Sequence, residues 1–209
     1  MICKQKIAEL TKCYCIAGFH DEAGEHILVA SEKDYPCHMF SLSGALEETL
    51  WETPGGVMSM VQVPGMTDCL LATRKFYSPN DSKAAYIAAI YREGDGWKEH
   101  TLCTLPHVHR FDIIPVGESL YLFAATLLSR REIKDDWSFP GKVYVGSLPQ
   151  DPRTGQLALE VVQEDLLMNH GYTSRVLDGQ VTPVIASANG VFAYTPIRGA
   201  NGQVAWRSQ

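Results

Sequence analysis

A short apolar run that closes on Ala followed by Ser or Thr occurs four times in this chain, and this recurrence limits the possible folds more than any other feature. The four runs are HILVAS at 26–31, CLLATR at 69–74, YLFAAT at 121–126 and TPVIAS at 182–187. A Gly-centred turn precedes each run, at Gly24, Gly65, Gly117 and Gly179. Glycine suits hairpin turns because these turns require positive φ. The chain is therefore expected to contain four copies of one hairpin.

Each copy extends to four strands. An apolar strand precedes each turn (CYCIAGF, VMSMVQV, RFDIIPV and TSRVLD), a third strand follows the polar excursion, and a fourth is more polar and alternating. No window shows a clean helical spacing of apolar residues. Four antiparallel strands repeated every 40–60 residues or so are typical of β-propeller blades. We therefore predict an all-β fold, a β-propeller of about four four-stranded antiparallel blades. A β-sandwich with coincidental spacing is the alternative.

The repeats divide a single propeller domain, residues 1–209, into four parts. The blade-like repeats are predicted at about 13–52, 53–104, 105–166 and 167–209. Residues 4–10, KQKIAEL, resemble a rim strand, yet the last blade has its own candidate at 203–208. Either the ring has more blades than this chain supplies, or 203–208 is a loop and the segment 4–10 closes four blades. We favour an incomplete ring, from a truncated chain or one that self-association with another copy completes.

Composition narrows the range of partners. The net charge is −6 and no basic cluster is present, so nucleic acid is not an expected partner. No apolar run approaches the roughly 18 residues that a bilayer requires, so no membrane contact is expected, and no signal peptide is apparent. The six cysteines contain one C-x-C pair, Cys13 and Cys15, and no second pair to complete a zinc site. Reduced thiols and a cytoplasmic location are expected, with disulfides in a secreted protein as the alternative.

The last hairpin carries a family resemblance. Leu177-Asp178-Gly179-Gln180, followed by VTPVIAS, Asn189-Gly190 and VFAYT, resembles the repeat of FG-GAP/VCBS propellers. Calcium loops of that group use several Asp at alternate positions, and the turns here lack that set, so calcium is not expected in them. Some members, such as aldos-2-ulose dehydratase, are sugar-processing lyases with metal-binding histidines near the channel. The resemblance implies a comparable enzyme.

Two histidines occupy equivalent positions in adjacent repeats. His109 lies sixteen positions before Ala125 and His170 sixteen before Ala186, whereas the second repeat has Gly56 at that offset. Both histidines lie where the rim strand of one blade leads into the inner strand of the next, which places them at one mouth of the channel. With His107, two residues before His109, they are suited to bind a divalent metal, or to act as general base. The alternative is that they hydrogen-bond loops between blades.

Other candidates surround these histidines. Arg110, followed by Asp112 on the same strand, is suited to orient a carboxylate or phosphate group of a substrate, or to form an ion pair with an Asp that bridges two blades. Tyr172 is a candidate substrate-binding residue or a core aromatic. The long loop 127–141 contains Arg130, Asp136 and Trp137, which offer charge and a stacking surface to a sugar. The alternative is a solvated loop pinned by Trp137.

Cations recur just after the second strand of three repeats, at Lys33, at Arg74 or Lys75, and at Arg130. A ring of such cations would attract an anionic ligand, although basic residues are also common at strand ends.

No nucleophile elbow, phosphate loop, dinucleotide fingerprint or H-E-x-x-H motif is present. Two functions stay open. The first is a small-molecule enzyme, a metal-assisted lyase or isomerase of a sugar or sugar acid, with its site at the channel mouth. The second is a non-catalytic propeller that binds a partner.

Overall fold

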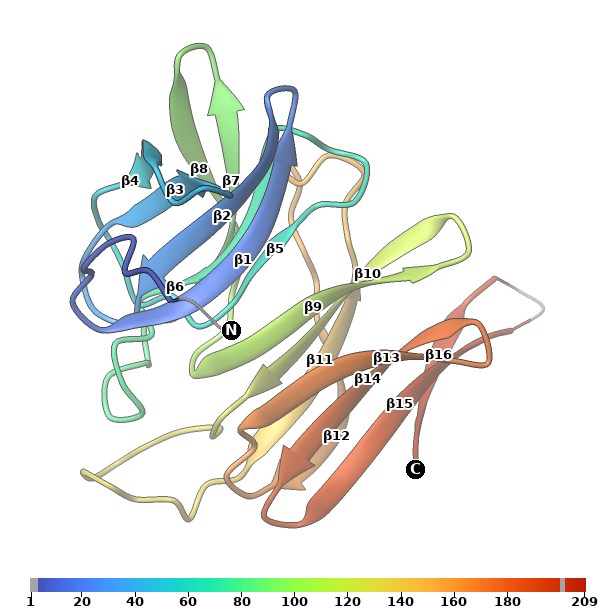
Figure 1. Ribbon diagram of the computed structural model, residues 1–209. Coiled ribbons are helices and arrows are strands. Elements are labelled where there is room, and N and C mark those ends of the chain that lie inside the picture. The colour runs from blue at the N-terminus through green and yellow to red at the C-terminus, as the bar shows by residue number, and fades with distance from the viewer. Residues whose placement is uncertain (1–3, 200–201) are drawn as a thin grey trace.

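Each of the four apolar runs is the second strand of a four-stranded antiparallel sheet (Figure 1). The computed structural model describes residues 4–199 and 202–209. The first sheet contains β1 (Cys13–Asp21), β2 (Gly24–Ser31), β3 (Cys37–Ser41) and β4 (Leu46–Trp51). The second contains β5 (Met60–Gln62), β6 (Cys69–Arg74), β7 (Tyr86–Glu93) and β8 (Gly96–Thr104).

The third sheet contains β9 (Val108–Val116), β10 (Ser119–Thr126), β11 (Gly141–Ser147) and β12 (Glu160–Leu166). The fourth contains β13 (Gly171–Leu177), β14 (Gln180–Ser187), β15 (Gly190–Arg198) and β16 (Val204–Ser208). In every sheet the strands pair in chain order. The prediction of an all-β propeller with four-stranded antiparallel blades is confirmed. Among the described residues, no helix has the length and apolar character that crossing a bilayer would demand.

Turn chemistry accounts for the hairpin registers. In the β13–β14 hairpin, Leu177 pairs with Gln180, which leaves Asp178 and Gly179 as a two-residue loop. Both residues have positive φ, 51° and 76°. A type I′ turn needs positive φ at both central positions, and an Asp-Gly pair meets that need at low cost.

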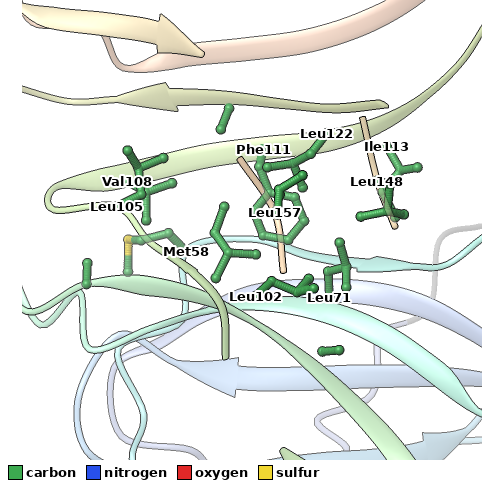
Figure 2. Close-up of a cluster of buried hydrophobic side chains, with 14 of the residues drawn as sticks. Met58, Leu71, Leu102, Leu105, Val108, Phe111, Ile113, Leu122, Leu148 and Leu157 are labelled. Carbon is green, nitrogen blue, oxygen red and sulfur yellow. The ribbon is translucent and has the colours of Figure 1, made fainter. Parts of the chain in front are cut away.

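The core consists of three apolar clusters, each between two consecutive sheets. Figure 2 shows the cluster between the second and third sheets, where Leu71 and Leu102 face Phe111 and Leu122. Leu157 joins this cluster from the loop between β11 and β12, and its backbone N–H donates to the carbonyl of Leu102 at 3.1 Å. The β11–β12 loop therefore helps to join the second blade to the third.

The predicted rim strand at 4–10 is not formed. These residues are in no strand, because β4 completes the first sheet and β16 pairs with β15 to complete the last. They lie instead over the outer face of the first sheet, where Ile7 and Leu10 share with Ile16 and Phe40 the lining of a cavity of about 750 Å³.

The five described cysteines are free, and Cys3 lies outside the described residues. Cys15, Cys37 and Cys69 are buried among apolar side chains. Burial raises the pKa of the Cys15 and Cys69 thiols to about 12, so these side chains are small uncharged core residues.

Candidate functional site

The N-terminal ends of the inner strands β1, β9 and β13 carry the residues that meet at the candidate site. Tyr14 is the second residue of β1, His109 is the second residue of β9, and His170 directly precedes β13. Met58 and Ser59 directly precede β5; the carbonyl of Met58 accepts a bond from Arg110, and the hydroxyl of Ser59 donates to the carbonyl of His109. Four blades thus contribute to one site.

The structure brings His109 and His170 together. Their ring centroids lie 4.4 Å apart with the ring planes tilted by 40°. His109 is 3% exposed, whereas His170 is exposed to solvent. The pair is therefore open to a ligand on the side of His170 and closed on the side of His109.

Asn169 fixes the position of His170. Its side chain is buried and its amide donates to the carbonyl of Thr126, at 3.2 Å, at the end of β10 in the third sheet. The backbone N–H of His170 donates to the carbonyl of Ala186 on β14. These bonds tie the start of β13 to both neighbouring elements before the imidazole projects toward His109.

Aromatic groups enclose His109. The ring of Phe76 packs edge-on at 5.2 Å between centroids, and the Tyr14 hydroxyl lies 3.4 Å from Nε2 of His109. The other ring nitrogen, Nδ1, is buried and has no hydrogen-bond partner among the described residues. A buried polar atom without a partner is unusual and marks a position for a ligand or ordered solvent.

Arg110 links three sheets beside the histidine pair. Its Nη1 donates to the carbonyl of Met58 at 2.7 Å, and its Nη2 donates to the hydroxyl of Tyr14 at 3.2 Å. The guanidinium also lies 5.4 Å from the centroid of the Tyr14 ring. Arg110 therefore holds Tyr14 next to His109 and bridges blades through a carbonyl and a hydroxyl rather than through an Asp. Oδ2 of Asp112, on the same strand, accepts a bond from Tyr172.

Burial sets the charge of the pair. It lowers the pKa of His109 to about 3, and the charges of Arg110 and His170 act in the same direction. Burial followed by the charge of Arg110 also lowers the pKa of His170. Both imidazoles are therefore neutral near pH 7, which is the form that ligates metals.

His107 does not join the pair. It precedes β9 and has positive φ, 64°, so the alternation that would place it on the same face as His109 does not apply. Its buried ring forms a hydrogen bond through Nδ1 with the hydroxyl of Ser82 at 2.8 Å. Burial, with the charges of Arg131 and Lys83, lowers its pKa to about 4. No three His, Cys, Asp or Glu side chains within 4–199 and 202–209 are placed to share one metal ion.

Tyr172 lies between the third and fourth sheets. Its hydroxyl donates to Oδ2 of Asp112 on β9 at 2.8 Å, and its ring packs near Phe123. Burial, reinforced by the charge of Asp112, raises the pKa of Tyr172 above its ordinary range. These contacts are those of a residue that joins two blades.

The residues proposed from the long loop interact within it. The guanidinium of Arg130 stacks on Phe139, and Asp136 accepts bonds from the backbone and hydroxyl of Ser138. Trp137 is half-buried against the core and carries the guanidinium of Arg131 over its ring at 4.6 Å. The loop is anchored to the second blade by Asn80, whose amide donates to Asp135 at 2.9 Å. None of these contacts reaches the histidine pair.

Sequence reasoning missed Tyr14, although a signal for it exists. Tyr14 lies sixteen positions before Ala30, the offset that His109 and His170 have from their own Ala residues. At the same offset in the second repeat, Gly56 has φ of 72°, and a Cβ there would lie 2.5 Å from the backbone nitrogen of Phe76. No side chain fits at that position, so the second blade cannot add a ligand there.

Comparison with solved structures finds β-propeller proteins. A mutant of Synechocystis apocarotenoid oxygenase matches with a TM-score of 0.54 and 11% identity, over 94% of this chain and 50% of that one. A cobalt-substituted form of the same oxygenase matches with a TM-score of 0.52 and 11% identity, over 94% and 50%. The α-L-arabinanase of Cellvibrio cellulosa matches with a TM-score of 0.51 and 11% identity, over 92% and 76%.

The chain spans about half the length of the oxygenase chains that it matches. At such low identity these likenesses show the fold alone. No protein-family model and no curated protein matches the sequence.

Proposed function

We propose that this chain is a propeller enzyme that acts on a small molecule at the channel mouth, with His109 and His170 as ligands of a divalent transition metal. One observation carries the proposal: two neutral imidazoles lie 4.4 Å apart, and one of them has a buried ring nitrogen without a partner. Placing two such groups side by side has no evident benefit for packing.

The low pKa of His109 distinguishes the two roles that its sequence position left open. A general base works best when its pKa is near the operating pH, and a value of about 3 is far below that range. A metal ligand, in contrast, must be unprotonated, and burial ensures that state. We therefore favour ligation over proton transfer for His109.

The residues present fit a metal in part. With the proton of His109 on Nε2, that nitrogen donates to the Tyr14 oxygen, which also accepts from Arg110, and the lone pair of Nδ1 is free. His109 and His170 then supply two nitrogen ligands of the kind that Zn, Fe, Co and Ni prefer. When bound, such an ion would polarise an oxygen of the substrate as a Lewis acid.

Self-association is our proposal for the remaining ligands. The outer faces of the end sheets expose apolar side chains: Ile16 on β1, beside the segment 4–10, is 67% exposed, and Val191 on β15 is 69% exposed. A second copy that packs these faces together would bring another histidine pair to the same mouth. One metal ion per two chains is the expected stoichiometry, with dimers in light scattering.

For the substrate we propose a sugar or sugar acid and a lyase or isomerase reaction. The resemblance to sugar-processing FG-GAP/VCBS propellers and the fold of the arabinanase support this class. The half-exposed side of the pair is the side open to the substrate.

The test uses Co²⁺ as a spectroscopic probe. Titration of the purified protein should produce visible d–d absorption, and the double variant H109A/H170A should lose it while retaining its near-UV circular dichroism. H20A, which removes an exposed histidine on β1, is the matched control and should bind as the parent does. Equal Co²⁺ affinity in the parent and the double variant would rule the site out.

A second arm addresses catalysis. Metal-loaded protein is incubated with sugar acids, and β-elimination is followed by the absorbance of the conjugated product. Turnover that is lost in H109A/H170A supports the lyase. Saturable binding of these compounds without any turnover would favour the non-catalytic binding module instead.

A further inference from the structure

We propose that the junction between the first and second sheets contains a binding site for a small monocarboxylate. The site is a cavity of about 180 Å³ between β4 on one side and β6 to β8 on the other. We call it the junction cavity. Its lining includes Leu50 and Trp51 from the first sheet and Arg74, Trp97, Lys98 and Glu99 from the second.

Arg74 is the central group of the junction cavity. It is only 1% exposed, and its guanidinium lies over the ring of Trp51 at 4.0 Å. Its Nη2 forms an ion pair with Oε2 of Glu99 at 3.1 Å. Its Nε and Nη1 are buried and find no acceptor anywhere in the described chain. Arg74 therefore does not join the predicted ring of cations, for which Lys75 was the alternative at this position, because Arg74 is buried at the junction between the blades.

Two further donors in the lining are also buried without an acceptor. Nε1 of Trp51 and Nε1 of Trp97 are both buried, and no acceptor is available to either among residues 4–199 and 202–209. The lining therefore holds four donor nitrogens that lack an acceptor. Leaving such a donor buried and unpaired is unfavourable, and more so for a charged group.

Glu99 does not satisfy these donors in the structure. Its Oε1 accepts from the hydroxyl of Tyr86 at 2.6 Å, and its Oε2 pairs with Arg74. An occupant that offers only acceptors would satisfy the remaining donors, and an oxyanion has that chemistry.

The charge of the lining selects a monoanion. Arg74 and Lys98 are cationic and Glu99 is anionic, so one positive charge is left over. A carboxylate balances this charge, whereas a phosphate dianion would leave an excess negative charge in a low-dielectric cavity. The small volume and the apolar walls of Leu50 and Ile90 suit a short aliphatic tail.

The aromatic walls are held in place before any ligand enters. Arg92 lies over the ring of Trp97 at 4.7 Å and is itself paired with Glu48 at 2.7 Å. Phe19 packs edge-on against Trp97 with centroids 5.7 Å apart. Such preorganisation lowers the cost of binding, since few side chains need to be ordered.

The test follows the indole N–H signals of ¹⁵N-labelled protein. The chain has four tryptophans, Trp51, Trp97, Trp137 and Trp206, whose signals are assigned with single Trp→Phe variants. Titration with sodium acetate, against sodium chloride at equal ionic strength, should move the signals of Trp51 and Trp97 saturably. Those of Trp137 and Trp206 should stay in place. Trp206 is the matched control, because its buried Nε1 also lacks a partner in the described chain but is not in the junction cavity.

Three further arms make the test decisive. Butyrate should bind at least as tightly as acetate, and inorganic phosphate should bind about tenfold more weakly. R74M should abolish the shifts. Because that variant removes a buried charge and can fail to fold, E99Q serves as the second variant, and it should tighten acetate binding several-fold by removing the nearby negative charge.

Two results would overturn the proposal. One is the absence of saturable shifts in Trp51 and Trp97 up to about 100 mM acetate, a concentration that would detect even a very weak site. The other is an E99Q protein with unchanged acetate affinity. Either would mean that ordered water satisfies the donors.

Discussion

The hydroxyl of Tyr14 and Nε2 of His109 lie 3.4 Å apart, although the two residues are 95 positions apart in the sequence and belong to different sheets. Arg110 holds this arrangement by donating to the same hydroxyl. The contact places the Tyr14 hydroxyl beside Nε2 of His109, where it can orient the imidazole ring.

The first prediction concerns that hydroxyl. Y14F should weaken Co²⁺ binding about tenfold, because groups that orient a histidine ligand are worth 10–100-fold in metal affinity. Its free energy of unfolding should change by only about 1 kcal/mol, since Tyr14 is partly exposed. Y35F, at another exposed tyrosine in the loop between β2 and β3, is the control. Unchanged Co²⁺ affinity in Y14F would mean that the hydroxyl does not orient His109.

The second prediction concerns pH. His26 is buried between Asp21 at 2.9 Å and Glu47 at 2.7 Å. Burial alone would lower the pKa of His26, but the hydrogen bonds with these carboxylates outweigh it and raise the pKa. Burial likewise acts to raise the pKa of Asp21, and the bond from His26 with those from the backbone of Ala23 and Gly24 lowers it.

The direction of the pH effect follows from these shifts. The stability that charged His26 contributes is complete below its ordinary pKa, about 6.5, and is lost as pH rises through its higher folded value. The contribution of Asp21 is present above about 3.8 and is lost as pH falls through its lower folded value. Urea unfolding should show a stability loss above neutral pH that H26Q removes and H20Q retains. An H26Q protein with the parental pH profile would contradict this account.

The third prediction compares two glycines with positive φ. At Gly56 a Cβ would meet the backbone of Lys75 and Phe76, whereas at Gly65 it would meet nothing within 4 Å. G65A should lose about 1 kcal/mol from φ strain alone, and G56A should lose about 3 kcal/mol because the backbone clash adds to the strain. Urea denaturation measures both. Equal losses of unfolding free energy in G56A and G65A would show that the close approach of the Lys75 and Phe76 backbone to Gly56 does not affect stability.

The fourth prediction concerns the apolar contact shown in Figure 2. L157A should reduce the free energy of unfolding by about 2–4 kcal/mol, because it leaves a cavity in the cluster between the second and third sheets. V161A, at an exposed position of the neighbouring β12, should change it by about 0.5 kcal/mol or less. A loss below 1 kcal/mol or so in L157A would mean that the β11–β12 loop does not join the blades.

The sequence predicted the fold because the local signals agree with the tertiary structure. The runs that end at Ala30, Ala72, Ala125 and Ala186 are second strands, since each is a hydrophobic segment preceded by a turn that favours a hairpin. The same kind of local pattern led to a wrong prediction for residues 4–10. Their pattern suits a strand, but β4 already takes the fourth-strand position of the first sheet and β16 that of the last.

The candidate site was predictable only in part. Equal offsets predicted that His109 and His170 occupy equivalent places, and the inner strands bring their rings together. His107 was assigned by strand alternation, and its positive φ breaks that rule one residue before β9 begins. The partners of Arg74, Arg110 and Trp137 depend on how neighbouring blades pack together. Contacts between blades produce no periodic pattern in the sequence, so these partners could not be predicted.

The site draws one residue from the same position of successive repeats: Tyr14 and then, after the glycine of the second blade, His109 and His170. The first, third and fourth blades thus each contribute one side chain to the same site. A substitution at one of these positions changes a single side chain of the site and leaves the hydrogen-bonded strands of that blade intact. Gly56 is the exception. A side chain there would clash with the backbone of Phe76, whose ring packs against His109. In this architecture the residues of the site can change while the strand pairing that maintains the fold stays the same.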